Sequence, residues 1–242
     1  MSVAAPAELE SGAASPEAVL RWAYESFPRV AIVASFQAES SVLIDMAVCI
    51  RPDVRVLTLD TGRLPQETYD MIDRVRDRYA IEIEVISPDA RDLAEMVGSH
   101  GVNLFHKSPD LRRLCCDVRK SRPLARALHR YDAWVTGVRR QQAATRSQTL
   151  VVAPDREHEG LTKIAPLASW TRDEVWAYIQ EHDLPYHPLY ERGYTSIGCE
   201  PCTRATVAGE DERAGRWWWE AENEVKECGL HWKSPTNSEA SP

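Results

Sequence analysis

Residues 29–50 read RVAIVASFQAESSVLIDMAVCI, a strand pattern joined to a helix pattern by a short polar loop. The segment VAIVA within residues 29–36 is apolar at every position, which suits a parallel strand covered on both faces. The apolar run VLIDMAVCI follows the loop directly and is typical of a buried helix. Cys49 lies inside this run, so we expect it to be a small core residue. The stretch therefore predicts the first strand–loop–helix unit of an α/β fold.

The same alternation continues along the chain. Residues 54–60, 81–87 and 132–138 are rich in β-branched residues and are expected strands, and a helical stretch follows each of the first three strands. Residues 65–79 illustrate these helices, because Pro65 stands at a first-turn position. Alternating strands and helices predict a parallel, twisted sheet flanked by helices, with right-handed crossovers. Ligands of such sheets bind beyond the carboxyl ends of the strands.

The domain organisation follows from the composition of successive segments. Residues 1–15 are polar and lack periodicity, which predicts a disordered N-terminus. Residues 16–226 are expected to form a single α/β domain, whose later elements are shorter and include a helix that begins at the capping box Thr171–x–x–Glu174. Residues 227–242 are expected to form a mobile, cysteine-bearing C-terminal segment.

Charge and composition exclude several classes of function. Lys and Arg number 29 against 37 Asp and Glu, which gives a formal net charge of −8. Without an overall basic field we expect no binding to nucleic acid or to an anionic membrane, so any bound anion needs a local group of cations. No apolar run reaches the roughly 18 residues of a membrane span, and residues 1–14 lack the Lys or Arg of a secretory signal. We therefore expect a cytoplasmic protein, and the oligomeric state stays open, a homo-oligomer included.

The polar loop between the first strand and its helix is a candidate phosphate site. Residues 35–41 read SFQAESS and offer backbone N–H groups and the positive end of a helix to an anion. Ser40 or Ser41 can equally cap the helix, and the loop lacks the Gly-Lys-Ser/Thr ending of a Walker-type loop. The second strand ends in LDTG at 59–62, where Asp60 is either an ordinary turn residue or part of a nucleotide pocket.

Four of the six cysteines form the most specific pattern in the chain. In a reducing compartment they are expected to be metal ligands or catalytic thiols rather than disulfides. Cys115 and Cys116 are adjacent, and Cys199 and Cys202 form a C-x-x-C pair. Adjacent cysteines on a helix diverge by about 100° and do not suit one zinc ion, whereas the separate irons of a [4Fe-4S] cube can each take one thiolate. The pattern therefore favours a cluster over a zinc site or unrelated buried thiols.

Cations gather around the adjacent pair. Residues 111–122 read LRRLCCDVRKSR and contain five basic residues but only one acid, Asp117. In a helix, Arg119 and Lys120 each follow one of the two cysteines by four residues and lie on its side. Such cations can bring an anionic cluster close to a phosphorylated substrate.

A further thiol stands close to the end of the chain. Cys228 lies in ECGLH at 227–231, next to Gly229 and close to His231. A mobile thiol that can enter a cationic site suits covalent redox chemistry, and a terminal cysteine without a role is the alternative.

Taken together, these motifs resemble the assimilatory sulfonucleotide reductases, and within them the adenosine 5′-phosphosulfate (APS) reductases that carry an iron–sulfur cluster. The resemblance extends from about residue 27 to residue 232. It rests on SFQAES at 35–40, LDTGRLPQETY at 59–69, CCDVRK at 115–120, TGVRRQQ at 136–142, TRSQ at 145–148, GCEPCTR at 198–204, RAGRWWWE at 213–220 and ECGLH at 227–231.

The resemblance implies a fold of the adenine-nucleotide α-hydrolase type, related to the PP-loop ATP pyrophosphatases, and the reduction of APS to sulfite and AMP in sulfate assimilation for cysteine biosynthesis. It implies that a [4Fe-4S] cluster is ligated by Cys115, Cys116, Cys199 and Cys202. Lys120 would lie between cluster and substrate, Cys228 would be the nucleophile, and His231 would belong to the site. The implied substrate-binding residues are Ser35, Phe36, Gln37, Glu39, Ser40, Asp60, Thr61, Gly62, Gly137, Arg146, Arg213 and Arg216. The three arginines among them would bind phosphate and sulfate oxygens.

In the implied reaction the Cys228 thiolate attacks the sulfur of APS and becomes an S-sulfocysteine while AMP leaves. A separate thioredoxin or glutaredoxin then releases sulfite, because no further C-x-x-C follows Cys202. Thiols supply both electrons, so the cluster is expected to have a structural and electrostatic role. The alternatives are reduction of the 3′-phosphorylated nucleotide (PAPS) and a non-catalytic zinc-binding module.

The sequence departs from its relatives at two places. The loop SFQAES differs from the Ser-Gly-Gly-x-Asp-Ser loop of the ATP pyrophosphatases, which argues against ATP as the substrate. Ala143 and Ala144 stand where many relatives carry Ser-Pro-Gly-like residues, which leaves the position of Arg146 open.

Overall fold

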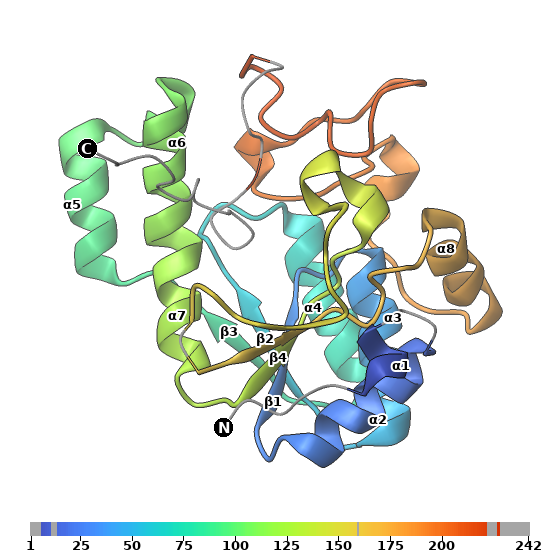
Figure 1. Ribbon diagram of the computed structural model, residues 1–242. Helices are drawn as coiled ribbons and strands as arrows, with labels where there is room; N and C mark the ends of the chain where they lie inside the picture. The colour runs from blue at the N-terminus through green and yellow to red at the C-terminus, as the bar shows by residue number, and fades with distance from the viewer. Residues whose placement is uncertain (1–5, 11–13, 159, 222–226, 228–242) are drawn as a thin grey trace, which may run out of the picture.

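Figure 1 shows the computed structural model, which describes residues 6–10, 14–158, 160–221 and 227. A six-stranded sheet forms its centre, in the order β3-β2-β1-β4-β6-β5, and all neighbouring strands are parallel except β5 and β6. The strands are β1 Val30–Ala34, β2 Arg55–Leu59, β3 Ile83–Ile86, β4 Ala133–Val135, β5 Val152–Pro154 and β6 Thr162–Ile164. The predicted α/β fold and its four named strands are confirmed, whereas the short β5–β6 edge was not predicted.

Helices cover both faces of this sheet (Figure 1). One face carries α2 Pro16–Ser26, α3 Ala38–Ile50, α4 Gln66–Tyr79 and α8 Arg172–Glu181. The other face carries α7 Arg122–Leu128, while α5 Ala90–His100 and α6 Pro109–Cys116 stand largely clear of the strands and share a separate apolar cluster. Among the residues that the structure describes, no helix combines the length and the apolar composition that a bilayer crossing requires.

The strand β1 is buried from both sides, which explains its uninterrupted apolar sequence. Val30, Ile32 and Ala34 belong to the large core that also contains residues of α2, α3, α4 and α8. Ala31, between them, belongs to a second core with Leu124 of α7. Because successive side chains of a strand point to opposite faces, both sets must be apolar.

Two predictions about burial and order need correction. Cys49 is exposed, because α3 is continuously buried only as far as Ala47 and its last turn reaches the surface. Within the N-terminal segment that was expected to be disordered, Ala7–Glu10 form the short helix α1, and Leu9 is buried against the large core. One apolar side chain therefore ties these four residues to the domain.

The helix that carries the adjacent cysteines changes its pitch directly after them. α6 ends at Cys116, and a π-helical segment, Asp117–Ser121, connects it to α7. The Arg122 N–H donates to the carbonyl of Asp117, five residues back. Lys120 and Arg119 therefore lie on a wider turn than the α-helix expected from the sequence.

The predicted capping box at the start of α8 is confirmed. The Glu174 N–H donates to Thr171 Oγ1 at 3.1 Å, and the Thr171 N–H donates to Glu174 Oε2 at 2.6 Å. Two backbone donors at the start of the helix are thereby satisfied.

Replacing Thr171 with alanine is expected to lower the free energy of unfolding by about 1 kcal/mol, because the Glu174 N–H loses its acceptor. Urea denaturation followed by circular dichroism measures this change. The control Thr171→Ser keeps the hydroxyl and should stay within about 0.5 kcal/mol of the wild type. Equal losses in the two variants would show that the cap contributes nothing.

Candidate active site

A cavity lies at the carboxyl ends of β1, β2 and β4. The chain continues from β1 toward β2 on one side and from β4 toward β6 on the other, so the strand order reverses between β1 and β4. Open α/β sheets bind ligands at the strand ends where the order reverses in this way. The predicted site residues that line this cavity are Ser35, Gln37, Glu39, Ser40, Thr61, Lys120, Gly137, Arg146, Arg213 and Arg216. The structure thus brings together residues from six separate parts of the sequence.

Side-chain hydrogen bonds fix the conformation of the loop after β1. Ser40 Oγ accepts a hydrogen bond from the Ser35 N–H at 3.0 Å, so Ser40 ties the loop together across the start of the helix. Gln37 is the N-cap residue of α3 and makes no side-chain cap bond. Its amide instead donates to Ser35 Oγ at 3.0 Å and accepts from the Ile197 N–H at 2.7 Å. Phe36 has a φ of 55° and is fully buried, outside the set of residues that line the cavity.

Two adjacent residues at the end of β2 have different surroundings: Asp60 is bonded within the turn, and Thr61 lines the cavity. Asp60 Oδ1 accepts from the Gly62 N–H at 2.7 Å and from the Tyr69 hydroxyl at 2.8 Å, and neither Asp60 nor Gly62 lines the cavity. Of the two interpretations of Asp60, the turn residue is therefore the one that the geometry supports. Thr61 is fully buried, lines the cavity, and places its Oγ1 3.3 Å from Cys199 Sγ.

The two cysteine pairs lie together. Cys115 and Cys116, at the end of α6, line one small cavity with Cys199 and Cys202, which bracket the short 3₁₀ turn Glu200–Cys202. All four thiols are 7–9% exposed. Lys120 lines both this cavity and the one at the strand ends, so its charge lies where the two cavities meet. Among the residues described, no group of three or more His, Cys, Asp or Glu side chains is close enough to bind one metal ion.

The surroundings of the four thiols affect their protonation differently. Burial raises the pKa of Cys115 and raises the pKa of Cys202 to about 12. Burial acts in the same direction on Cys199, but the charge of Lys120 and the hydrogen bond with Thr61 outweigh it, and the pKa of Cys199 is lowered. The thiol that contacts Thr61 of the strand-end cavity is thus one for which the protein favours negative charge.

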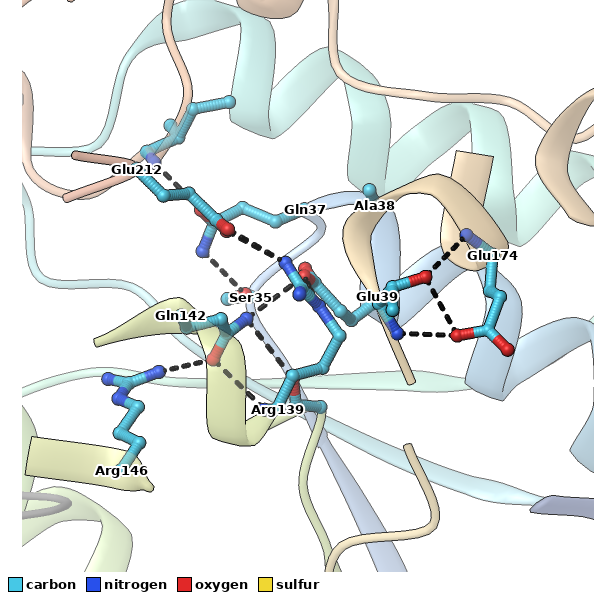
Figure 2. A network of polar contacts seen from close by, with 12 residues as sticks. Ser35, Gln37, Ala38, Glu39, Arg139, Gln142, Arg146, Glu174 and Glu212 are labelled. Carbon is cyan, nitrogen blue, oxygen red and sulfur yellow. Dashed lines mark hydrogen bonds and ion pairs between the residues drawn. The ribbon is translucent and has the colours of Figure 1, made fainter. Parts of the chain in front are cut away.

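A buried polar network supports the cavity from the α3 side (Figure 2). Arg139, 1% exposed, donates from Nε to Glu39 Oε1 at 2.7 Å and from Nη2 to Glu212 Oε1 at 2.8 Å. Gln142 donates to Glu39 Oε1 at 2.9 Å and accepts from Arg146 Nη1 at 2.6 Å. Sequence reasoning assigned no role to Arg139 or Gln142, although both lie in the motif TGVRRQQ, and nothing local indicates Glu212.

The three predicted arginines meet at the same wall of the cavity. Arg216 donates to the Ile197 carbonyl at 3.2 Å, and its guanidinium lies 4.8 Å from the centre of the Trp217 ring. A Cβ at Gly198 would lie 2.2 Å from Arg216 Nη2, so this glycine leaves room for the guanidinium. Arg146 and Arg213 both bind the carboxylate of Glu227, a residue that the sequence analysis did not assign.

Comparison with known proteins identifies the family. A model of the phosphoadenosine phosphosulfate reductase domain matches residues 29–205. This chain belongs to that reductase family. It is 46% identical over 228 residues to an adenosine 5′-phosphosulfate reductase of Burkholderia cepacia, which covers 93% of this chain and 90% of the relative. It is 48% identical over 205 residues to an adenosine 5′-phosphosulfate reductase of Allochromatium vinosum, which covers 84% of this chain and 78% of the relative.

Solved structures with a similar fold support the predicted α/β architecture of this chain. A phosphoadenylyl-sulfate reductase from Candida auris, solved as a phosphate complex, superposes with a TM-score of 0.69 at 29% identity and covers 86% of this chain and 100% of that one. An FMN adenylyltransferase from Candida glabrata superposes with a TM-score of 0.58 over 96% of this chain and 81% of its own. Its identity is 13%, so this second likeness shows the fold alone.

Two predicted site residues of this family member, Cys228 and His231, lie outside the described residues. Glu227, directly before Cys228, is described and is 2% exposed. The position of Arg146, left open by the Ala143-Ala144 departure, is now known: it lies in the short 3₁₀ turn Ala144–Arg146 and lines the cavity.

Replacing Gly137 with alanine is expected to destabilise the fold by about 1–3 kcal/mol, because the added Cβ would lie 2.8 Å from Glu39 Cβ and force the start of α3 away from β4. Chemical denaturation measures the loss. Gly98 in α5 is the matched control, since a Cβ there meets nothing within 4 Å and should stabilise the helix by up to about 1 kcal/mol. Wild-type stability in Gly137→Ala would contradict the close approach.

Proposed function

We propose that this chain is an oxidoreductase that reduces adenosine 5′-phosphosulfate (APS) to sulfite and AMP in sulfate assimilation. Relatives at 46% and 48% identity are named for this reductase activity. The observation that carries the proposal is that a cavity lined by arginines and a cavity lined by four cysteines share Lys120. A substrate with two anionic groups, held beside anionic sulfur, needs cations between them.

The strand-end cavity would bind the nucleotide. Ser35 and its loop neighbours would bind through backbone and hydroxyl groups, with Thr61 and Gly137 at the neighbouring strand ends. Arg213 and Arg216, together with Arg146, would bind the phosphate and sulfate oxygens, because guanidinium groups match such oxygens in charge and geometry. Phe36, Asp60 and Gly62, which lie outside the lining, would act by holding the two loops in shape.

The cysteine cavity would hold a [4Fe-4S] cluster through Cys115, Cys116, Cys199 and Cys202. The donor set fits, since four buried thiols line one small cavity and thiolates are the ligands of such a cluster. Near this cavity, Trp217 Nε1 and Arg119 Nε are buried without a hydrogen-bond acceptor in the described part of the chain, and sulfur can accept such bonds. When bound, the cluster would supply fixed negative charge and a cross-link between two segments.

Cys228 would carry the covalent step. Its thiolate attacks the sulfur of APS, an S–S bond forms, the sulfur–oxygen bond to AMP breaks, and AMP leaves with the electron pair. Lys120 and the arginines would offset the repulsion between thiolate and substrate. His231, three residues further on, would belong to the same site.

The second half of the reaction would need a separate protein. A dithiol from thioredoxin or glutaredoxin attacks the S-sulfocysteine, releases sulfite, and is left as a disulfide, so that it provides both electrons. Such reductants operate in the cytoplasm, where we place this enzyme. Residues 16–226 would then bind nucleotide and cluster, and residues 227–242 would carry the nucleophile.

Mixing the protein with APS in the absence of reductant should add one SO₃ group to the peptide that contains Cys228, because the reaction stops at the covalent intermediate. Mass spectrometry of the digested protein measures this adduct. Cys228→Ser should lose the adduct with unchanged iron content, whereas Cys49→Ser, at the surface end of α3, should keep it. No adduct on the wild type would refute the proposed reaction, and faster formation from PAPS would overturn the choice of APS.

Anaerobically purified protein should absorb near 400 nm and contain about four irons and four sulfides. Cys116→Ala should lose iron and thermal stability together, since ligand loss and local unfolding are coupled. Iron analysis and thermal denaturation measure the two quantities, with Cys49→Ala as the control that keeps both. Stoichiometric zinc in a colourless protein would support the non-catalytic module instead.

A further inference from the structure

Glu227 is a buried carboxylate in the site described above, and no role has been assigned to it. It is 2% exposed, although it is the first of the sixteen residues 227–242. Burial raises its pKa, but the hydrogen bonds and charges of Arg146 and Arg213 outweigh burial and hold the pKa below its usual range. Glu227 is therefore an anion inside the protein at neutral pH.

The carboxylate is bound by residues that line the strand-end cavity. Arg146 donates from Nε to Oε1 and from Nη2 to Oε2, both at 2.9 Å, in a bidentate pair. Thr145 Oγ1 donates to Oε1 at 2.9 Å, and Arg213 Nη2 donates to Oε2 at 3.2 Å. Bidentate arginine–carboxylate pairs fix orientation as well as position.

The third nitrogen of the Arg146 guanidinium is also bound. Nη1 donates to Gln142 Oε1 at 2.6 Å, so all three nitrogens of Arg146 have acceptors within the protein. A guanidinium carries five N–H groups, and Glu227 and Gln142 take three of those of Arg146. Arg146 can therefore hold the C-terminal segment and still offer N–H groups to substrate oxygens.

The backbone of Glu227 is bound from the other cavity. Arg112 Nη1 donates to the Glu227 carbonyl at 2.8 Å. Arg112 is fully buried, lines the cysteine cavity, and stands one helical turn before the adjacent cysteines. Its Nε and Nη2 bind Glu220 at 2.9 and 3.0 Å. Glu227 is thus fixed between the two cavities at both its side chain and its main chain.

We propose that Glu227 is a positioning residue, which anchors the segment carrying the Cys228 thiol through Arg146, Arg213 and Arg112. This inference rests on the proposed function, in which Cys228 is the nucleophile. Consecutive Cα atoms lie about 3.8 Å apart, so an anchor at Glu227 would limit the distance that the next residue can move. Covalent catalysis needs this restriction, because misplacement of a reacting group by about 1 Å can reduce the rate 100-fold.

The test separates positioning from substrate binding. Glu227→Gln keeps the shape of the side chain but removes its charge, so the anchor is weakened and the arginines keep their positive charge. We expect single-turnover formation of the Cys228 S-sulfo adduct to slow about 10- to 100-fold, whereas AMP binds as tightly as to the wild type or more tightly. Glu227→Asp keeps the charge on a shorter side chain and should recover part of the rate.

A second readout does not depend on the reaction. Alkylation of Cys228 by iodoacetamide, followed peptide by peptide in the absence of nucleotide, should become faster in Glu227→Gln, while the exposed Cys49 serves as the internal reference. Glu210→Gln is the matched control, because Glu210 pairs with Arg204 away from the anchor and should change neither rate. Thermal denaturation verifies that each variant is folded.

The outcomes distinguish the two proposals. If the wild type forms no adduct on Cys228, the proposed function fails, and the alkylation rates still report on the anchor. If the wild type forms the adduct and Glu227→Gln forms it at the same rate, Glu227 does not position Cys228. Faster adduct formation in Glu227→Gln, or a parallel loss of rate and of AMP affinity in a folded protein, would also overturn the inference.

Discussion

Carboxylates neutralise three buried arginines, and these ion pairs determine how the later part of the chain covers the sheet. Arg112, Arg139 and Arg146 are 0%, 1% and 9% exposed, and each binds carboxylates that are distant in sequence. Removing one partner of a buried ion pair costs about 3–5 kcal/mol, so the segments that supply the partners are held firmly. Those partners are Glu39, Glu212, Glu220 and Glu227. Three of the four come from the last part of the chain, which is thereby fastened over the cavity.

Much of the sheet could be predicted because its signals are local. The segment VAIVA is apolar at every position since both faces of β1 are covered, and Pro65 and the Thr171 cap mark the starts of helices. The strands β5 and β6, three residues each, are too short to show a periodicity. The predicted burial of Cys49 was wrong for a different reason. An apolar run predicts a buried helix but does not indicate at which residue that helix reaches the surface.

The part of the candidate site that the sheet topology brings together could be predicted from the sequence. The part that depends on single side-chain contacts could not. Parallel strands end at the same edge of the sheet, so the loops after β1 and β2 were expected to be neighbours. The two cysteine pairs were expected to meet because four thiolates in this pattern suit one cluster. Asp60 shows the limit, because an aspartate in a turn and one in a pocket have the same sequence signal. Glu212 and Glu227 lie in segments without periodicity, and only the folded structure reveals the guanidinium that each one binds.

The π-helical turn at Asp117–Ser121 restricts how this part of the protein can change over evolution. A π turn corresponds to an α-helix with one extra residue accommodated in a bulge. Deletion of one residue from this turn would return it to α-helical pitch and keep α7 on the same side of the adjacent cysteines, because the bulge absorbs that residue. A second deletion would rotate α7 relative to the cysteines by about 100°, and either the cysteines or Leu124 would then face the wrong way. We therefore expect natural relatives to differ in the length of this stretch by no more than the one residue that the bulge absorbs.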